Sequence, residues 1–204
     1  MKILLTGFEP WGEWGRNPSG EVAQALNGAR IGTCEVVAVT LPVVHGEDIT
    51  RVVPLMDAHR PGAVVSLGLG GASVLHVERV AINLKVVDGA DAPVVAGGPD
   101  AFFATLPTRK MVERMRASGV PARLTYSAGT FLCNHIMYSV LHRVAVQNLE
   151  TLAGFVHLPP LPEQVAERGG SGGSMALEHV QKGVVAGLEA VATHLAERSD
   201  NRVV

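Results

Sequence analysis

Short apolar runs rich in β-branched residues alternate along the chain with segments in which apolar residues recur at helical spacing. The runs predict strands at residues 2–6, 34–43, 63–67, 122–126 and 152–157. The periodic segments predict helices at residues 17–27, 47–59, 106–118, 131–148 and 175–197. Strands that alternate with helices form βαβ units, whose strands lie parallel between helices. The alternation therefore predicts a three-layer α/β/α fold with a mainly parallel twisted sheet.

Three segments stand outside this alternation. Residues 74–87 are predicted to be mostly extended and to form a hairpin arm beyond the sheet edge, whereas residues 88–99 contain Gly and Pro and are predicted to form a loop. Residues 169–174 are rich in Gly and Ser, which is typical of a flexible surface loop, with a mobile flap beside the site as the alternative. We see no repeat or linker, so we expect residues 1–204 to form a single domain.

The composition argues against several classes of function. The formal net charge is −2 and no basic cluster is present, which argues against nucleic acid as a partner. No apolar run approaches the roughly 20 residues that span a bilayer, and Glu9 comes too early for a signal peptide. We therefore expect a cytoplasmic protein without a membrane partner. Charged residues make up only 18% of the chain, against about 25% in an average protein, which favours a homo-oligomer with a buried interface.

Cys133 is the first candidate for chemistry. The chain has one other cysteine, Cys34, and we expect no disulfide between them in a reducing compartment. Gly129 and Thr130 predict the turn that starts the helix at residues 131–148, so Cys133 falls in its first turn. Free backbone N–H groups and the helix dipole favour a thiolate there and can hold an oxyanion. The alternative interpretation is an ordinary buried cysteine.

His157 is the histidine best placed to serve as a base. His135 lies two residues from Cys133 on the same predicted helix and points to a different face, and His142 lies more than two turns away. His157 instead ends an apolar run that predicts a core strand, and open α/β sheets gather their sites at the carboxyl ends of strands. The alternative is a strand-end residue packed against a loop.

Glu78 is the candidate for orienting that imidazole, as a nucleophile–base pair requires. It is a carboxylate inside an apolar stretch, and burying such a group is costly unless it is paired. The alternative is an ion pair with Arg79 or Lys85.

Residues 68–71, Gly-Leu-Gly-Gly, lack the full dinucleotide fingerprint. Neither a Cys-x-x-Cys pair nor a His-Glu-x-x-His helix is present, so we expect no metal.

Several groups of residues, in a fixed order, carry a resemblance to a known family. They are TGFEPWG (6–12), NPS (17–19), LPVV (41–44), ERVAIN (78–83), GGP (97–99), TLP (105–107), AGTFLCNH (128–135), GFVHLP (154–159) and LPEQ (161–164). With these matches the chain resembles, nearly end to end, the pyroglutamyl-peptidase I (pyrrolidone carboxyl peptidase) family. The resemblance implies that Cys133, His157 and Glu78 are the catalytic residues.

The resemblance also implies an activity and a binding pocket. It implies hydrolysis of the bond after an N-terminal pyroglutamyl (5-oxoproline) residue of peptides, through a thioester acyl-enzyme, without a cofactor or metal. It further implies a homo-oligomer, usually a tetramer. A pyroglutamyl ring carries no charge and needs an apolar slot with a few polar contacts. The residues at the corresponding positions are Phe8, Trp11, Asn17, Val43, Leu69, Phe131 and Leu132, and Trp14 lies nearby in sequence. The alternative interpretation for the aromatic residues and Leu132 is packing in the core.

Two departures from the family pattern keep other functions open. Leu69 stands where the family usually has Gln, and residues 84–89 lack the Arg that usually follows Asn83. One alternative is a related cysteine hydrolase that cuts another lactam or amide. The other is a catalytically weak homologue that binds pyroglutamyl peptides or free 5-oxoproline as a sensor.

Overall fold

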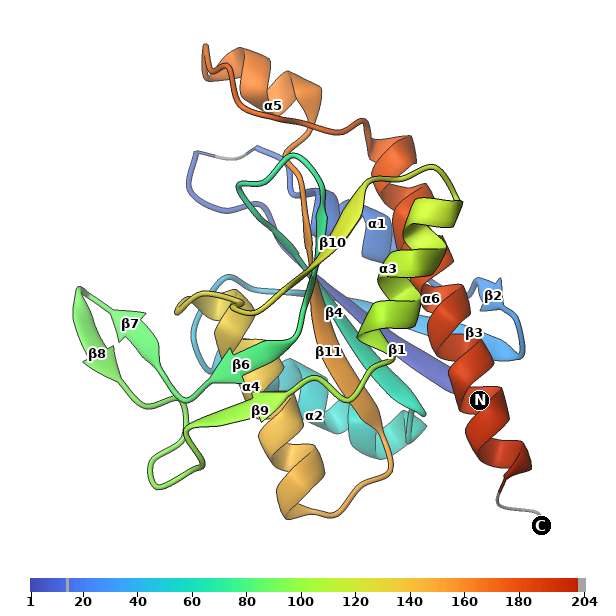
Figure 1. The fold of residues 1–204 in the computed structure, drawn as a ribbon. Coiled ribbons are helices and arrows are strands. Elements are labelled where there is room, and N and C mark those ends of the chain that lie inside the picture. Colours follow the sequence, from blue (N-terminus) through green and yellow to red (C-terminus); the bar gives the residue numbers. More distant parts are fainter. Residues whose placement is uncertain (14, 202–204) are drawn as a thin grey trace.

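The computed structural model describes residues 1–13 and 15–201, so Trp14 lies outside the described residues. A seven-stranded sheet forms its centre, in the order β10-β5-β11-β4-β1-β3-β2 (Figure 1). The strands are β1 (Lys2–Phe8), β2 (Arg30–Ile31), β3 (Cys34–Leu41), β4 (Ala63–Leu69), β5 (Leu75–Glu78), β10 (Ala122–Thr125) and β11 (Leu152–Leu158). The pairs β1–β3, β1–β4 and β11–β4 are parallel, whereas β5 is antiparallel to β11. The sheet is therefore mainly parallel, as predicted.

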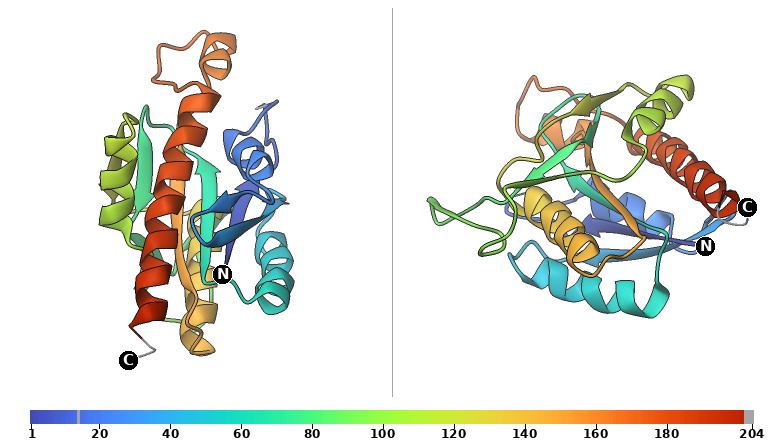
Figure 2. Two further views of the ribbon diagram at one scale, coloured as in Figure 1. Left: turned by 90° about the vertical axis from the view of Figure 1, so that its right-hand side faces the viewer. Right: turned by 60° about the horizontal axis from the view of Figure 1, so that its bottom comes forward.

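Helices cover both faces of the sheet, which makes three layers (Figure 2). On one face lie α2 (Glu47–His59) and α4 (Leu132–Val146), and on the other lie α1 (Pro18–Ala25), α3 (Thr108–Ala117) and α6 (Leu177–Asp200). A separate cluster of buried apolar side chains fills each interface between sheet and helices. Within the described residues, no helix combines the length and the apolar character needed to cross a membrane.

The segment after β4 corrects two of the predictions. β5 does not lie beyond the sheet edge but inside the sheet, between β10 and β11, because it buries Leu75 and Val77 in the core. The chain then leaves the sheet, and β7 (Lys85–Val87) pairs with β8 (Ala90–Ala92) in a hairpin that projects from the body, so residues 88–99 are not all loop (Figure 1). Asp88 and Gly89, with φ of 52° and 78°, make its two-residue turn.

Shorter elements escaped the sequence patterns. β6 (Val80–Ile82) pairs with β9 (Ala101–Phe103) outside the main sheet, and α5 (Pro162–Glu167) follows β11. With three to six residues each, these elements are too short for a periodic pattern. The predicted helix at residues 106–118 begins only at Thr108, and the one at 175–197 runs over Leu177–Asp200. Residues 169–174 contain no helix or strand.

Candidate active site

Cys133 is the second residue of α4, and the local sequence explains why the helix begins there. Gly129 has a φ of 79°, a left-handed conformation that glycine adopts readily and that turns the chain into the helix. The first helical bond runs from the His135 N–H to the Phe131 carbonyl oxygen, 2.9 Å. The amides of the preceding helical residues have no intrahelical acceptor. They are free to stabilise negative charge beside the partly exposed thiol of Cys133.

Two buried polar side chains fix the start of α4. Asn134 is fully buried, and its amide accepts from Ile82 N–H at 2.9 Å and donates to the carbonyl oxygens of Ile82 and Leu84, both at 2.8 Å. His135 Nδ1 lies 2.7 Å from Asp48 Oδ2, and both side chains are buried. His135 is therefore engaged with α2, away from Cys133. Sequence reasoning missed Asp48, whose pairing with α4 depends on the packing of two helices.

His157 lies at the end of β11, between Glu78 and Cys133. Its Nδ1 is 2.8 Å from Glu78 Oε1, and the side chain of Cys133 lies close enough to the ring to interact with it. Glu78 is only 1% exposed, so its pairing with His157 offsets the cost of burying the carboxylate. Arg79, the alternative partner of Glu78, instead donates to the carbonyl oxygen of Ala104. The three sequence candidates are thus in contact in the folded chain.

The surroundings of His157 favour its charged form. Burial lowers the pKa of this imidazole, but the hydrogen bonds and negative charges of Cys133 and Glu78 outweigh burial and raise its pKa to about 9. A protonated His157 beside Cys133 at neutral pH is the arrangement expected of a thiolate–imidazolium pair. The second oxygen of Glu78, Oε2, is buried and has no hydrogen-bond partner among the described groups. Within the described residues, the hydrogen bond with His157 is therefore the one that pairs this buried carboxylate.

Glycines at the end of β4 allow the helix and the sheet to approach each other at this point. A Cβ atom on Gly68 would lie 2.9 Å from Cys133 Sγ and 2.6 Å from the ring of Phe155, and one on Gly70 would lie 3.0 Å from His157 Cβ. These glycines lie at the end of a strand, but the next element is β5 and not a helix. They therefore serve close packing around Cys133 rather than dinucleotide binding.

A mostly apolar cavity of about 240 Å³ opens beside Cys133. All seven residues proposed for substrate binding line it, and the full lining is Phe8, Trp11, Asn17, Val43, Leu69, Gly70, Gly71, Phe131, Leu132, Cys133 and Pro160. Sequence reasoning missed Gly70, Gly71 and Pro160, which carry no distinctive chemistry.

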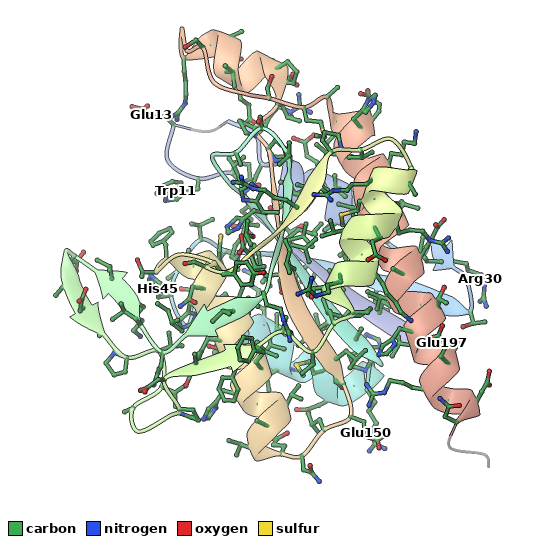
Figure 3. All side chains as sticks on the ribbon, viewed as in Figure 1. Trp11, Glu13, Arg30, His45, Glu150 and Glu197 are labelled. Carbon is green, nitrogen blue, oxygen red and sulfur yellow. The ribbon has the colours of Figure 1, made fainter. Side chains whose placement is uncertain are left out.

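The cavity has a buried floor and an exposed mouth. Phe8 and Leu132 are buried, so they serve the core and the cavity wall together. Trp11 and Phe131 are 51% and 42% exposed, and their ring centroids are 5.6 Å apart. His45 packs edge-on against Phe131 at 5.2 Å, and Figure 3 shows Trp11 and His45 on the same side of the molecule. Large aromatic surfaces therefore surround the entrance.

Hydrogen bonds fix the position of Asn17 in the cavity wall. Asn17 caps α1 by accepting from the Ser19 N–H, and its amide group donates to the Glu9 carbonyl oxygen at 2.9 Å. Within the described residues, no three His, Cys, Asp or Glu side chains gather as ligands for a metal.

Comparisons with known proteins agree with this geometry. The family model described as pyroglutamyl peptidase matches residues 1–194. A pyrrolidone-carboxylate peptidase from Cupriavidus taiwanensis is 46% identical over 98% of this chain and 95% of its own length. One from Escherichia fergusonii is 41% identical over 88% of this chain and 87% of its own.

Solved structures match the fold as well. The crystal structure of pyroglutamyl peptidase I from Bacillus amyloliquefaciens superposes with a TM-score of 0.90 at 33% identity, covering 95% of this chain and 98% of that one. Pyrrolidone carboxyl peptidase from Pyrococcus furiosus gives 0.91 at 34% identity, covering 96% and 100%. These matches confirm the predicted fold class and the predicted family resemblance.

Proposed function

The chain belongs to the pyroglutamyl peptidase family of cysteine-type hydrolases, and we propose that it removes an N-terminal pyroglutamyl residue from peptides with Cys133 as nucleophile. The observation that carries the proposal is the contact chain Cys133–His157–Glu78 beside an apolar cavity. The cavity suits an uncharged lactam ring, and the nucleophile lies in its wall. The seven lining residues inferred from the sequence are the proposed ring-binding set.

The proposed reaction is acyl transfer in two steps. The thiolate of Cys133 attacks the pyroglutamyl carbonyl carbon, and amides at the start of α4 stabilise the oxyanion. The C–N bond breaks as the protonated His157 gives its proton to the leaving amine, which leaves a thioester on Cys133. His157 then takes a proton from water, which attacks the thioester and releases 5-oxoproline. Glu78 keeps the imidazole oriented and stabilises its charged form.

Comparing a pyroglutamyl amide with a prolyl amide, which both carry a five-membered ring, tests the substrate assignment. We expect the protein to release the fluorophore from a pyroglutamyl amide and to leave the prolyl amide essentially intact. The prolyl ring carries a charged amine, which the apolar cavity has no carboxylate to pair with. The measurement is kcat/KM for the two fluorogenic amides. Saturable binding of the pyroglutamyl compound without turnover would instead support a sensor, and turnover of a different lactam alone would support another hydrolase.

We also propose that the protein works as a homo-oligomer, a tetramer or dimer. The low charged fraction supports this assembly, and so do large apolar side chains that remain exposed on the single chain, among them Phe103, Tyr126 and Val146 at 63%, 64% and 70%. Sedimentation at micromolar protein concentration is expected to give a mass of at least two chains. A monomer under those conditions contradicts the proposal.

We also propose that residues 1–204 form a single domain and that the protein works in the cytoplasm. The clusters of buried side chains flank one continuous sheet, which supports a single domain over residues 1–204. Cys34 and Cys133 are both free, which fits work in the reducing cytoplasm.

A further inference from the structure

A row of directly paired residues crosses four strands beside Cys133. Gly68 on β4 pairs with His157 on β11, His157 pairs with His76 on β5, and His76 pairs with Arg123 on β10. Residues that pair directly across neighbouring strands project from the same face of the sheet. Cys133 lies over Gly68 at the first position of the row. The face therefore carries Cys133, His157, His76 and Arg123 in that order, at strand spacings of about 4.8 Å.

The order of the residues in this row determines which way a bound substrate runs across the strands. The ring-binding cavity is lined from β1 and β4, through Phe8 and Leu69, and none of its lining comes from β5 or β10. The leaving nitrogen has to meet His157, because His157 supplies its proton. A substrate with its ring in the cavity and its carbonyl at Cys133 therefore directs the residue after pyroglutamate toward His76 and Arg123.

His76 and Arg123 form a hydrogen-bonded pair at that end of the row. Arg123 Nε donates to His76 Nε2 at 2.8 Å, so the neutral imidazole carries its proton on Nδ1. Burial and the positive charge of Arg123 both lower the pKa of His76, so the ring stays neutral and the guanidinium supplies the charge. In the described part of the chain, Arg123 forms no ion pair with a carboxylate, and its side chain is exposed.

We propose that Arg123 and His76 form a subsite for a carboxylate on the residue that follows pyroglutamate. This inference rests on the proposed function and specifies its substrate class. A guanidinium with free N–H groups binds a carboxylate through parallel hydrogen bonds. The carboxylate can be the chain end of a pyroglutamyl dipeptide or an acidic side chain at the second position.

Binding to the Cys133→Ala variant, measured by calorimetry, tests the subsite with two matched pairs of ligands. The first pair is pyroglutamyl-alanine and its amide, which differ in the main-chain carboxylate. The second is pyroglutamyl-glutamate amide and pyroglutamyl-glutamine amide, which differ in a side-chain carboxylate. We expect the carboxylate to tighten binding about 5–10-fold in one pair, a modest gain because the guanidinium is exposed. Adding Arg123→Gln is expected to bring that ratio close to one.

Arg109→Gln is the matched control. Arg109 is exposed on α3, across the sheet from the row, so the substitution removes the same charge from the protein and should leave the ratio unchanged. A preference in the first pair supports recognition of dipeptides, and one in the second supports acidic second residues. Equal affinities in both pairs, a preference that survives Arg123→Gln, or no binding at all overturns the subsite.

The same ligands keep this inference separate from the proposed function. The peptidase activity is measured on the wild-type protein with a neutral fluorogenic amide that has no carboxylate. If that amide is turned over but the affinities are equal in both pairs, the subsite proposal is rejected and the peptidase proposal is retained. A carboxylate preference without any turnover retains the subsite and rejects the peptidase.

Discussion

Replacing Cys133 by alanine is expected to lower turnover of a pyroglutamyl amide by about 10⁴-fold or more, because no other group can form the acyl-enzyme. The thiol is partly exposed and alanine keeps the Cβ atom, so the variant should fold and keep its cavity. The measurements are kcat on the fluorogenic amide, the melting temperature, and the affinity for a pyroglutamyl peptide.

Cys34→Ala provides the matched control for this substitution. Cys34 is the other free thiol, it is buried in β3, and it lies outside the cavity lining. Its replacement is expected to lower stability modestly, through the small void it leaves, and to retain turnover. Iodoacetamide should inactivate the wild type and Cys34→Ala at similar rates. If Cys133→Ala retained more than a few per cent of the wild-type rate, Cys133 would not be the nucleophile.

Local sequence patterns predicted most strands of the sheet and the helices that cover it, but they did not predict the position of β5. Its residues alternate like any strand, and its place between β10 and β11 depends on pairing with segments dozens of residues away. The hairpin of β7 and β8 was predictable in part, because Asp88-Gly89 is a common two-residue turn signal.

Some residues of the candidate site could likewise be predicted from local sequence patterns, and others could not. The helix-start cysteine and the strand-end histidine followed from local patterns, whereas the seven cavity residues came from the family resemblance. The row that joins His157, His76 and Arg123 depends on strand register, which no local pattern in this chain specifies.

The structure shows where the two departures from the family pattern lie. Leu69 lines the cavity with an apolar side chain, so polar contacts to the lactam have to come from backbone groups. The segment that lacks the expected Arg forms the short hairpin of β7 and β8. A guanidinium is nevertheless present on the active-site face of the sheet, on β10, where Arg123 approaches from the side of the leaving group. The charge is therefore placed to act on the second residue of the substrate.

Replacing Glu78 by glutamine is expected to lower kcat/KM by about 10²–10³-fold and to move the alkaline limb of its pH profile downward. With Glu78 in place, the pKa of His157 is raised from 6.5 to about 9, and the imidazolium persists below that pH and is lost as the pH rises through it. Glutamine is similar in shape but uncharged, so the pKa of His157 should fall. The thiolate–imidazolium pair should then be lost at a lower pH than in the wild type.

The test compares pH profiles of kcat/KM and of iodoacetamide alkylation between pH 5 and pH 10. The kcat/KM profile of the wild type should show an alkaline limb near pH 9, where His157 loses the proton that it gives to the leaving amine. Glu113→Gln, an exposed carboxylate on α3, removes the same charge at a distance and should reproduce the wild-type profile. An unchanged limb in Glu78→Gln would mean that the buried carboxylate does not control the imidazole, although the two groups lie 2.8 Å apart. Glu78 would then have to act through the orientation of the ring alone.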